Sequence, residues 1–446
     1  MRPRDLVFLC VLAIVLALTR WPFVPKYLFH FDSVNMALAI ENFDPHLHQP
    51  QPPGYPLYVV LLKILHGIGF TVEYTMVASA IVAGCLAGWM LWRFCSDMGS
   101  CRAGWISAVI LLFSPVFWFN SVTNQSRSFI AVASAGTAWF AWRAGQRDAH
   151  PGWLIGAAAF LGTMAGFRPV ESLMLSPLLL WAIWRGRPQW KTVAFAVASG
   201  AIPVLAWGSW MLAESRGLES YVDLMLRYSA EQRVFEATSK WQAFVFSLQY
   251  LGSVHLAVLL PWVWALFFAR PKMDGRWLFL AVWTIPSLGF QLLGHSADPC
   301  HLFATITAAS WVGGWTLDAM DGRKALVGAA VAACLGTGLF LRPLRGPAAY
   351  ASLFVLNRVD KATTEAVDLG REAASNGPIT IIIKDSPVSW RHLIYYIPGT
   401  PVWVYEHHRW WSPTKEKKPR EESQGPFLLV NGTGTQVVTA LPAAAP

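Results

Sequence analysis

The stretch that decides the fold is residues 74–95, YTMVASAIVAGCLAGWMLWRFC, in which Arg93 is the single charged residue. A helix needs about 20 apolar residues to cross the ~30 Å hydrocarbon core of a bilayer. Comparable apolar runs recur along the chain, so the sequence predicts an all-α polytopic membrane protein with about eleven transmembrane helices. These runs lie at 6–24, 74–95, 103–120, 128–144, 152–167, 170–185, 191–213, 242–268, 277–294, 300–318 and 325–341.

The composition agrees with a membrane protein. The chain is 54% hydrophobic and only 14% charged, whereas a soluble domain carries roughly 25% charged residues. The net charge of +9 lies in short clusters between apolar runs, which is typical of membrane topology and not of a nucleic-acid partner. The six cysteines show no CxxC spacing, so we expect neither a disulfide framework nor a cysteine metal site.

Charge also predicts which side of the membrane each loop faces. If residues 55–70 do not cross, twelve Lys and Arg residues fall in inner short loops and only Arg127 and Arg168 in outer ones. This is a strong positive-inside bias, and it would reverse if 55–70 crossed. We therefore expect an interfacial or re-entrant helix at 55–70. The N-terminus is then cytoplasmic, and 6–24 is an uncleaved first span because no small-residue cleavage site follows it.

The predicted topology divides the chain into three parts. Beyond the last span, the β-rich runs 379–384 and 401–405 flank a helical stretch at 388–397, which indicates a small extracytoplasmic α/β domain. The charged residues 415–422 and the Ala/Pro-rich end indicate a loose tail. The parts are a transmembrane domain at 1–341 with its first outer loop at 25–73, the α/β domain at 342–412 and the tail at 413–446.

Candidate chemistry concentrates in the first outer loop. Asp32 follows the first span and precedes a short helix that we expect to begin near Ser33. A carboxylate at an apolar interface is able to accept a proton from an attacking hydroxyl or amine. The alternative is that Asp32 caps the following helix. His46 and His48 lie in the corner DPHLHQPQPPGYPLY at 44–58, where they bind an anion or metal or are simply solvated, and where prolines stiffen the backbone.

This pattern resembles that of the GT-C superfamily of membrane glycosyltransferases. The resemblance rests on an acid soon after the first span, a short amphipathic helix and the PPGYPLY corner at 52–58. It covers chiefly residues 29–62, with weaker echoes in GFRP at 166–169 and HSADPCH at 295–301. The nearest families are those like protein O-mannosyltransferases, aminoarabinose transferases and lipopolysaccharide-core galacturonosyltransferases. The resemblance implies a GT-C-like fold and sugar transfer from a polyprenyl-phosphate donor, with Asp32 as general base.

A lipid phosphate leaving group needs cationic or hydrogen-bonding partners. Arg127 and Arg168 stand at the outer ends of spans against the charge bias, where an arginine is costly without a partner. The candidate residues for binding the donor phosphate or the substrate are Arg127, Arg168, His48, Gln49, Tyr55, His295, Asp298 and His301.

Two departures from the family pattern leave the donor and the metal open. Ser33 follows Asp32 where many relatives carry a second acid, so a two-carboxylate metal site is not supported. We expect no resident cofactor, with a divalent metal as the alternative. Gln51 stands where aminoarabinose-transferase-like relatives carry a basic residue before the double proline, with His48 as the candidate substitute.

Two rival functions stay open: a lipid-linked sugar flippase or carrier, and a non-catalytic membrane assembly subunit. Carriers usually place ionisable groups near the bilayer midplane, whereas this chain gathers them at the outer face. The nearest exception is Glu171, which is expected to pair with Arg168. Expected partners are the donor, a glycan, lipid or protein acceptor and the bilayer, and compact loops favour a bacterial inner membrane. The cluster WRHLIYY at 390–396 contacts an acceptor or only packs the small domain.

Overall fold

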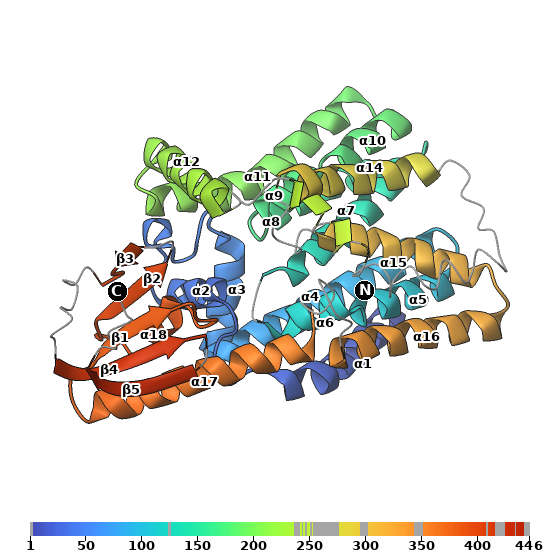
Figure 1. The fold of residues 1–446 in the computed structure, drawn as a ribbon. Helices are drawn as coiled ribbons and strands as arrows, with labels where there is room; N and C mark the ends of the chain where they lie inside the picture. Colours follow the sequence, from blue (N-terminus) through green and yellow to red (C-terminus); the bar gives the residue numbers. More distant parts are fainter. Residues whose placement is uncertain are drawn as a thin grey trace.

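The structure of the protein, a computed structural model, describes most of the chain. The described residues are 3–123, 126–235, 276–294, 302–342, 351–406, 409–414, 424–432 and 434–440, with isolated positions between 241 and 252. The fold is mostly helical, and a five-stranded sheet lies at one end of the helix bundle, beside α2 (Phe31–Glu41) and α18 (Trp390–Tyr396) (Figure 1).

Helices form where the sequence predicts spans. Every predicted span within the described residues contains a helix, and 242–268 lies largely outside them. The helices are α1 (Pro3–Arg20), α4 (Val72–Asp97), α5 (Cys101–Leu112), α6 (Pro115–Val122), α7 (Ser128–Ala144), α8 (Gly152–Ala165), α9 (Pro169–Leu175), α10 (Pro177–Gly186), α11 (Trp190–Glu214), α14 (Arg276–Gly289), α15 (Phe303–Asp318) and α16 (Gly322–Leu341).

The length of these helices does not confirm eleven spans. Among the described residues, α1, α4, α11 and α16 are long and apolar enough to cross a membrane, and the bent pair α5 and α6 adds a fifth if it counts as one span. Others are shorter: α8 has 14 residues, and α9 and α10 meet at Ser176. Several apolar helices therefore support an integral membrane protein, while the predicted number stays unconfirmed.

The predicted span 103–120 is broken rather than continuous. Its two helices, α5 and α6, meet at a bend of 59°. Pro115 begins α6 and has no N–H to give to a carbonyl of α5. Arg20, at the end of α1, donates from Nη2 to the Leu112 carbonyl oxygen, and its guanidinium carbon lies 3.9 Å from the Trp118 ring centroid. The arginine therefore satisfies a carbonyl that the end of α5 leaves open.

The first outer loop contains the two expected helices. The amphipathic stretch forms α2, and 55–70 forms α3 (Pro56–Gly67), whose 12 residues are too few to cross a bilayer. Along α3 and its C-cap, Val60, Ile64 and Ile68 are exposed at intervals of four residues and share one face. An exposed apolar stripe beside a polar corner suits a helix that lies in the membrane interface.

The C-terminal domain is an α/β unit. Its helices are α17 (Leu353–Ser375) and α18. Its strands are β1 (Thr380–Lys384), β2 (Val402–Glu406), β3 (Arg409–Trp411), β4 (Gln424–Asn431) and β5 (Gly434–Ala440), in the order β3-β2-β1-β4-β5. β1 pairs in parallel with β2 and β4, and both edge strands are antiparallel. The predicted strands at 379–384 and 401–405 and the helix between them are confirmed.

The prediction of a loose tail from 413 is wrong for residues 424–440. These residues form β4 and β5, and the apolar run Phe427–Val430 is buried in the sheet. The charges at 415–422 prompted the prediction, but they lie outside the described residues. The apolar run after them supplies enough buried surface to order a hairpin at the edge of the sheet. The boundary between 341 and 342 remains a prediction.

Candidate active site

Asp32 lies inside the first turn of α2 and does not cap it. The N-cap is His30, whose Nδ1 accepts the backbone N–H of Asp32 at 3.2 Å and lies 3.5 Å from Oδ2 of the carboxylate. The Asp32 side chain is 23% exposed. The alternative that Asp32 caps the helix is therefore wrong, because His30 is the N-cap residue. A negative charge is also favoured in the first turn of a helix, where the backbone N–H groups point toward it.

Two contacts bring later segments of the chain to the first outer loop, one at this turn and one at the proline corner. Ser33 is buried, and its hydroxyl donates to the Thr123 carbonyl at 3.2 Å, which ties α2 to the segment leading to Arg127. The Leu57 N–H donates to the Gly166 carbonyl at 3.0 Å, which ties the proline corner to the segment leading to Arg168. The weak echo at 166–169 therefore packs directly on the stronger motif.

Tyr55 lies beside one of the predicted arginines, Arg168. The guanidinium carbon of Arg168 lies 5.2 Å from its ring centroid. Burial raises the pKa of Tyr55 to about 12, so its hydroxyl stays protonated at neutral pH and is able to donate. Charges act over about 10 Å at 0.1 M salt, and four charged groups also shift the pKa of this phenol. They are Arg168, Glu171, Asp32 and Arg127.

Both arginines are buried. Arg168 Nη2 lies 2.8 Å from Oε1 of Glu171, and both side chains are less than a tenth exposed, so the expected pair is confirmed. Arg168 Nη1 also donates to the Ser126 hydroxyl at 3.4 Å. Arg127 immediately precedes α7 and is 6% exposed. Two buried guanidinium groups therefore lie at the starts of α7 and α9 (Pro169–Leu175).

His48 is partly buried and lies beside Tyr228. Its backbone has a φ of +58°, and its ring centroid lies 5.8 Å from that of Tyr228 on α12 (Leu218–Phe235). Burial lowers the pKa of His48 below its ordinary value, the charge of Arg391 lowers it further, and the carboxylate of Asp32 opposes the shift. The imidazole is therefore neutral at pH 7 and is within the electrostatic range of the candidate base.

Gln49 is used in the structure of the loop itself. Its backbone forms an isolated antiparallel bridge with Asp44, with N–O distances of 2.7 and 3.0 Å, and its Oε1 accepts from Asn42 Nδ2 at 3.4 Å. Three residues before it in the motif, Nε2 of His46 lies 3.2 Å from the Ser215 carbonyl oxygen. These contacts join Gln49 to the corner itself and His46 to the end of α11 and the start of α12.

Replacing Gly54 by alanine is expected to lower the melting temperature of the protein. Gly54 has a φ of +112°, and a Cβ there would lie 2.4 Å from Met211 Cε. The methionine end is able to move, but left-handed backbone costs an L residue roughly 1–2 kcal/mol. Thermal unfolding of the purified protein measures the change. Gly67→Ala is the control, because its Cβ meets no atom within 4 Å, and equal shifts for both variants would contradict the assignment of strain to Gly54.

The C-terminal domain docks on the first outer loop. Tyr396 accepts the Leu28 N–H at 2.9 Å and donates to Glu73 at 2.7 Å, while Tyr27 donates to Asp368 at 2.6 Å. The role of the 390–396 cluster in an acceptor contact remains a prediction. These contacts had no signal in the sequence, because the partners are more than 300 residues apart.

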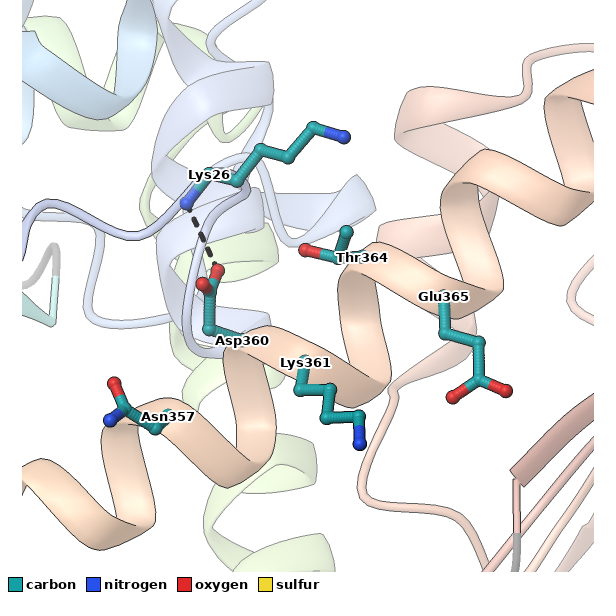
Figure 2. A pocket seen from close by; sticks show the side chains of 6 residues that line it. All are labelled: Lys26, Asn357, Asp360, Lys361, Thr364 and Glu365. Atoms are coloured by element: carbon teal, nitrogen blue, oxygen red, sulfur yellow. Dashed lines mark hydrogen bonds between the residues drawn. The ribbon is translucent and has the colours of Figure 1, made fainter.

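An open groove of about 600 Å³ lies at the same junction (Figure 2). The Lys26 backbone N–H donates to Asp360 Oδ1 at 3.0 Å across its mouth. None of the predicted site residues lines it, so it belongs to the domain junction and not to the candidate site. The lining residues are Lys26, Asn357, Asp360, Lys361, Thr364 and Glu365.

Part of the prediction falls outside the described residues: His295, Asp298 and His301. Their role remains a prediction. Within the part of the chain that the structure describes, no three His, Cys, Asp or Glu side chains are grouped to hold a metal. The cysteines described there, Cys10, Cys85, Cys95, Cys101 and Cys334, are free thiols.

Comparison with known proteins finds a family model that matches part of the chain. Residues 50–210 match the model of the family described as dolichyl-phosphate-mannose-protein mannosyltransferase. This range begins within the proline corner and includes both buried arginines. No curated protein matches the chain.

Solved structures of ArnT and of an oligosaccharyltransferase match the chain. ArnT from Cupriavidus metallidurans bound to undecaprenyl phosphate matches with a TM-score of 0.59 and 14% identity, over 90% of this chain and 85% of that one. The apo state of the same enzyme gives 0.57 and 16% over the same shares. An apo oligosaccharyltransferase from Archaeoglobus fulgidus gives 0.47 and 13%, over 88% and 63%. The family model matches part of the chain in which the sequence resembles the GT-C superfamily, and the ArnT structures confirm a fold of the same kind, with a small C-terminal sheet in this chain.

Proposed function

We propose that the protein transfers a sugar from a polyprenyl-phosphate donor to an acceptor on the outer side of a bacterial inner membrane, with Asp32 as general base. The observations that carry the proposal are the burial of Arg127 and Arg168, the contact of Arg168 with the Tyr55 ring, and the hydrogen bond from Ser33, next to Asp32, to the Thr123 carbonyl. A base and two cations in one neighbourhood are the groups that such a transfer needs. The contact of the C-terminal domain with the first outer loop supports an outer position for both.

The reaction follows from the charges of these groups. The acceptor hydroxyl or amine attacks the anomeric carbon and forms the new glycosidic bond, while the bond from that carbon to the phosphate oxygen breaks. Asp32 takes the proton that the acceptor loses. The bonding electrons leave with the polyprenyl phosphate. Attack opposite the leaving group inverts the anomeric centre, as in the related families.

The leaving phosphate gains negative charge as the bond breaks, and the buried arginines are placed to stabilise it. Arg127 and Arg168 supply guanidinium N–H donors, which bind phosphate oxygens strongly. The protonated Tyr55 hydroxyl adds a neutral donor. The fold match to ArnT bound to undecaprenyl phosphate supports a lipid phosphate of this kind.

The remaining candidates have supporting roles in the proposal. Neutral His48 offers a ring nitrogen to the acceptor or the sugar, beside Asp32. Gln49 fixes the loop that carries it. His295, Asp298 and His301 face the same compartment in the predicted topology and are candidates for the rest of the cavity or for a divalent cation.

The experiment is transfer by the purified protein in lipid nanodiscs. Mass spectrometry of cells with and without the gene first identifies the sugar that is lost from an envelope glycan and the lipid-linked donor that accumulates. The extracted donor and the acceptor are then incubated with the protein. We expect sugar on the acceptor and free polyprenyl phosphate in equal amounts. A flippase or an assembly subunit would change the cells but form no product in this assay, which would overturn the proposal.

A further inference from the structure

A side chain of the C-terminal domain, that of Arg391, bonds directly to the helix that carries Asp32. Arg391 lies on α18, and its Nη1 donates to Oδ1 of Asn35 on α2. Asn35 Nδ2 in turn donates to Oε1 of Gln51 at 3.3 Å. Asn35 and Gln51 are 1% and 6% exposed. The guanidinium therefore ends a buried chain of amides that runs into the first outer loop.

The two amides belong to the two halves of the candidate site. Asn35 follows Asp32 by three residues on α2, so both lie on one side of the helix. Gln51 immediately precedes the double proline of the corner that carries Tyr55. The hydrogen bond between Asn35 and Gln51 fixes the rotation of α2 relative to this corner. Arg391 holds the Asn35 amide, which bonds to both Gln51 and Arg391.

The charge of Arg391 also reaches the site. It acts on His48, on which the carboxylate of Asp32 acts with the opposite sign. A hydrogen bond from a charged donor is roughly twice as strong as a neutral one. If the arginine were removed, a buried amide oxygen would lose its donor, and the Asn35 side chain would be able to turn away from Gln51.

We propose that Arg391 is a positioning residue for sugar transfer, which acts through Asn35 on the turn that carries Asp32 and through Gln51 on the corner that carries Tyr55. The C-terminal domain is then part of the active site. The inference rests on the proposed function, because it assigns a role in the same reaction.

Arg391→Met tests the proposal, with Arg371→Met as a matched control. Arg371 is also an arginine of this domain at the docking interface, where its Nε donates to the Tyr396 carbonyl at 3.1 Å and its guanidinium lies 5.6 Å from the Tyr27 ring centroid. We expect Arg391→Met to lower kcat about 10- to 100-fold, as a small misplacement of reacting groups does. The KM for the lipid-linked donor should stay within about three-fold of wild type, since the buried arginines are unchanged. Arg371→Met should leave kcat within about two-fold.

Two further variants separate positioning from docking. Arg391→Lys keeps a charged donor and is expected to recover at least about a third of the wild-type kcat. Asn35→Ala is expected to lower kcat like Arg391→Met, and the double variant should be no worse than either, since coupled residues are not additive. Arg391→Leu is a second variant without a side-chain donor and has the same expected loss, and it keeps the test decisive if the methionine variant does not fold.

Equal loss of kcat in Arg391→Met and Arg371→Met would mean that the domain acts only by docking, and the inference would be wrong. A wild-type kcat in both neutral Arg391 variants would also overturn it. The proposed function fails by a different result, which is absence of product from the wild-type protein. The two failures are therefore distinguishable in one assay.

Discussion

Asp32→Asn is expected to lower kcat about 10²- to 10⁴-fold, the usual contribution of a general base. Asparagine has nearly the same shape but cannot take the proton of the acceptor. The helix start should survive, because the N-cap of α2 is His30, which accepts the backbone N–H of residue 32, and the variant keeps that N–H. Single-turnover transfer and the binding of labelled donor measure the two effects separately, and donor binding should change by less than about three-fold.

Asp44→Asn is the matched control for this loss of charge. Asp44 lies in the same outer loop, where its Oδ1 accepts the His46 N–H at 2.9 Å and caps a short turn. Asparagine caps as well as aspartate, so this variant should keep its stability and its turnover. Full activity of Asp32→Asn would remove the carboxylate from the mechanism. Equal loss in both variants would instead assign the effect to the loop as a whole.

Arg168→Met should lower kcat about 10²- to 10³-fold, which is typical when one donor to a developing negative charge is removed. The substitution also leaves Glu171 buried without its closest cation. Breaking a buried ion pair in this way destabilises a protein by about 3–5 kcal/mol, so low activity of the single variant is ambiguous alone.

The double variant Arg168→Met/Glu171→Gln resolves that ambiguity. It removes both charges of the pair, which lie 2.8 Å apart, and should restore most of the lost stability. Turnover should remain low, because the phosphate still lacks its donor. Thermal unfolding and kcat of the two variants are the measurements. Recovery of activity in the double variant would show that Arg168 serves only to neutralise Glu171.

Much of the fold follows from local pattern, and its exceptions have local causes. Apolar runs predicted helices in every described span, and the β-rich runs predicted β1 and β2. The break at Pro115 was missed because hydropathy stays high across it, although a proline that begins a helix is a stop signal for the one before. The hairpin of β4 and β5 was missed because the charges of 415–422 outweighed the short apolar run that follows.

The candidate site was predictable where motif and charge bias agreed. The motif singled out Asp32 and Tyr55, the bias singled out Arg127 and Arg168, and the structure places Arg168 beside Tyr55 and buries both arginines. The capping alternative failed because the helix starts two residues earlier than Ser33. The link from Arg391 to Asn35 has no local signal, since the partners lie 356 residues apart.

This separation along the chain has a consequence for biosynthesis. At roughly 5–20 residues per second, the ribosome needs about 20–70 s to make the stretch between Asn35 and its partner on α18. During that interval the groups that later pair with the first loop, such as the hydroxyl of Tyr396, do not yet exist. Because unpaired backbone groups are costly once buried, the loop closes last. The contact between the first loop and the C-terminal domain therefore forms only after the C-terminal domain has been translated.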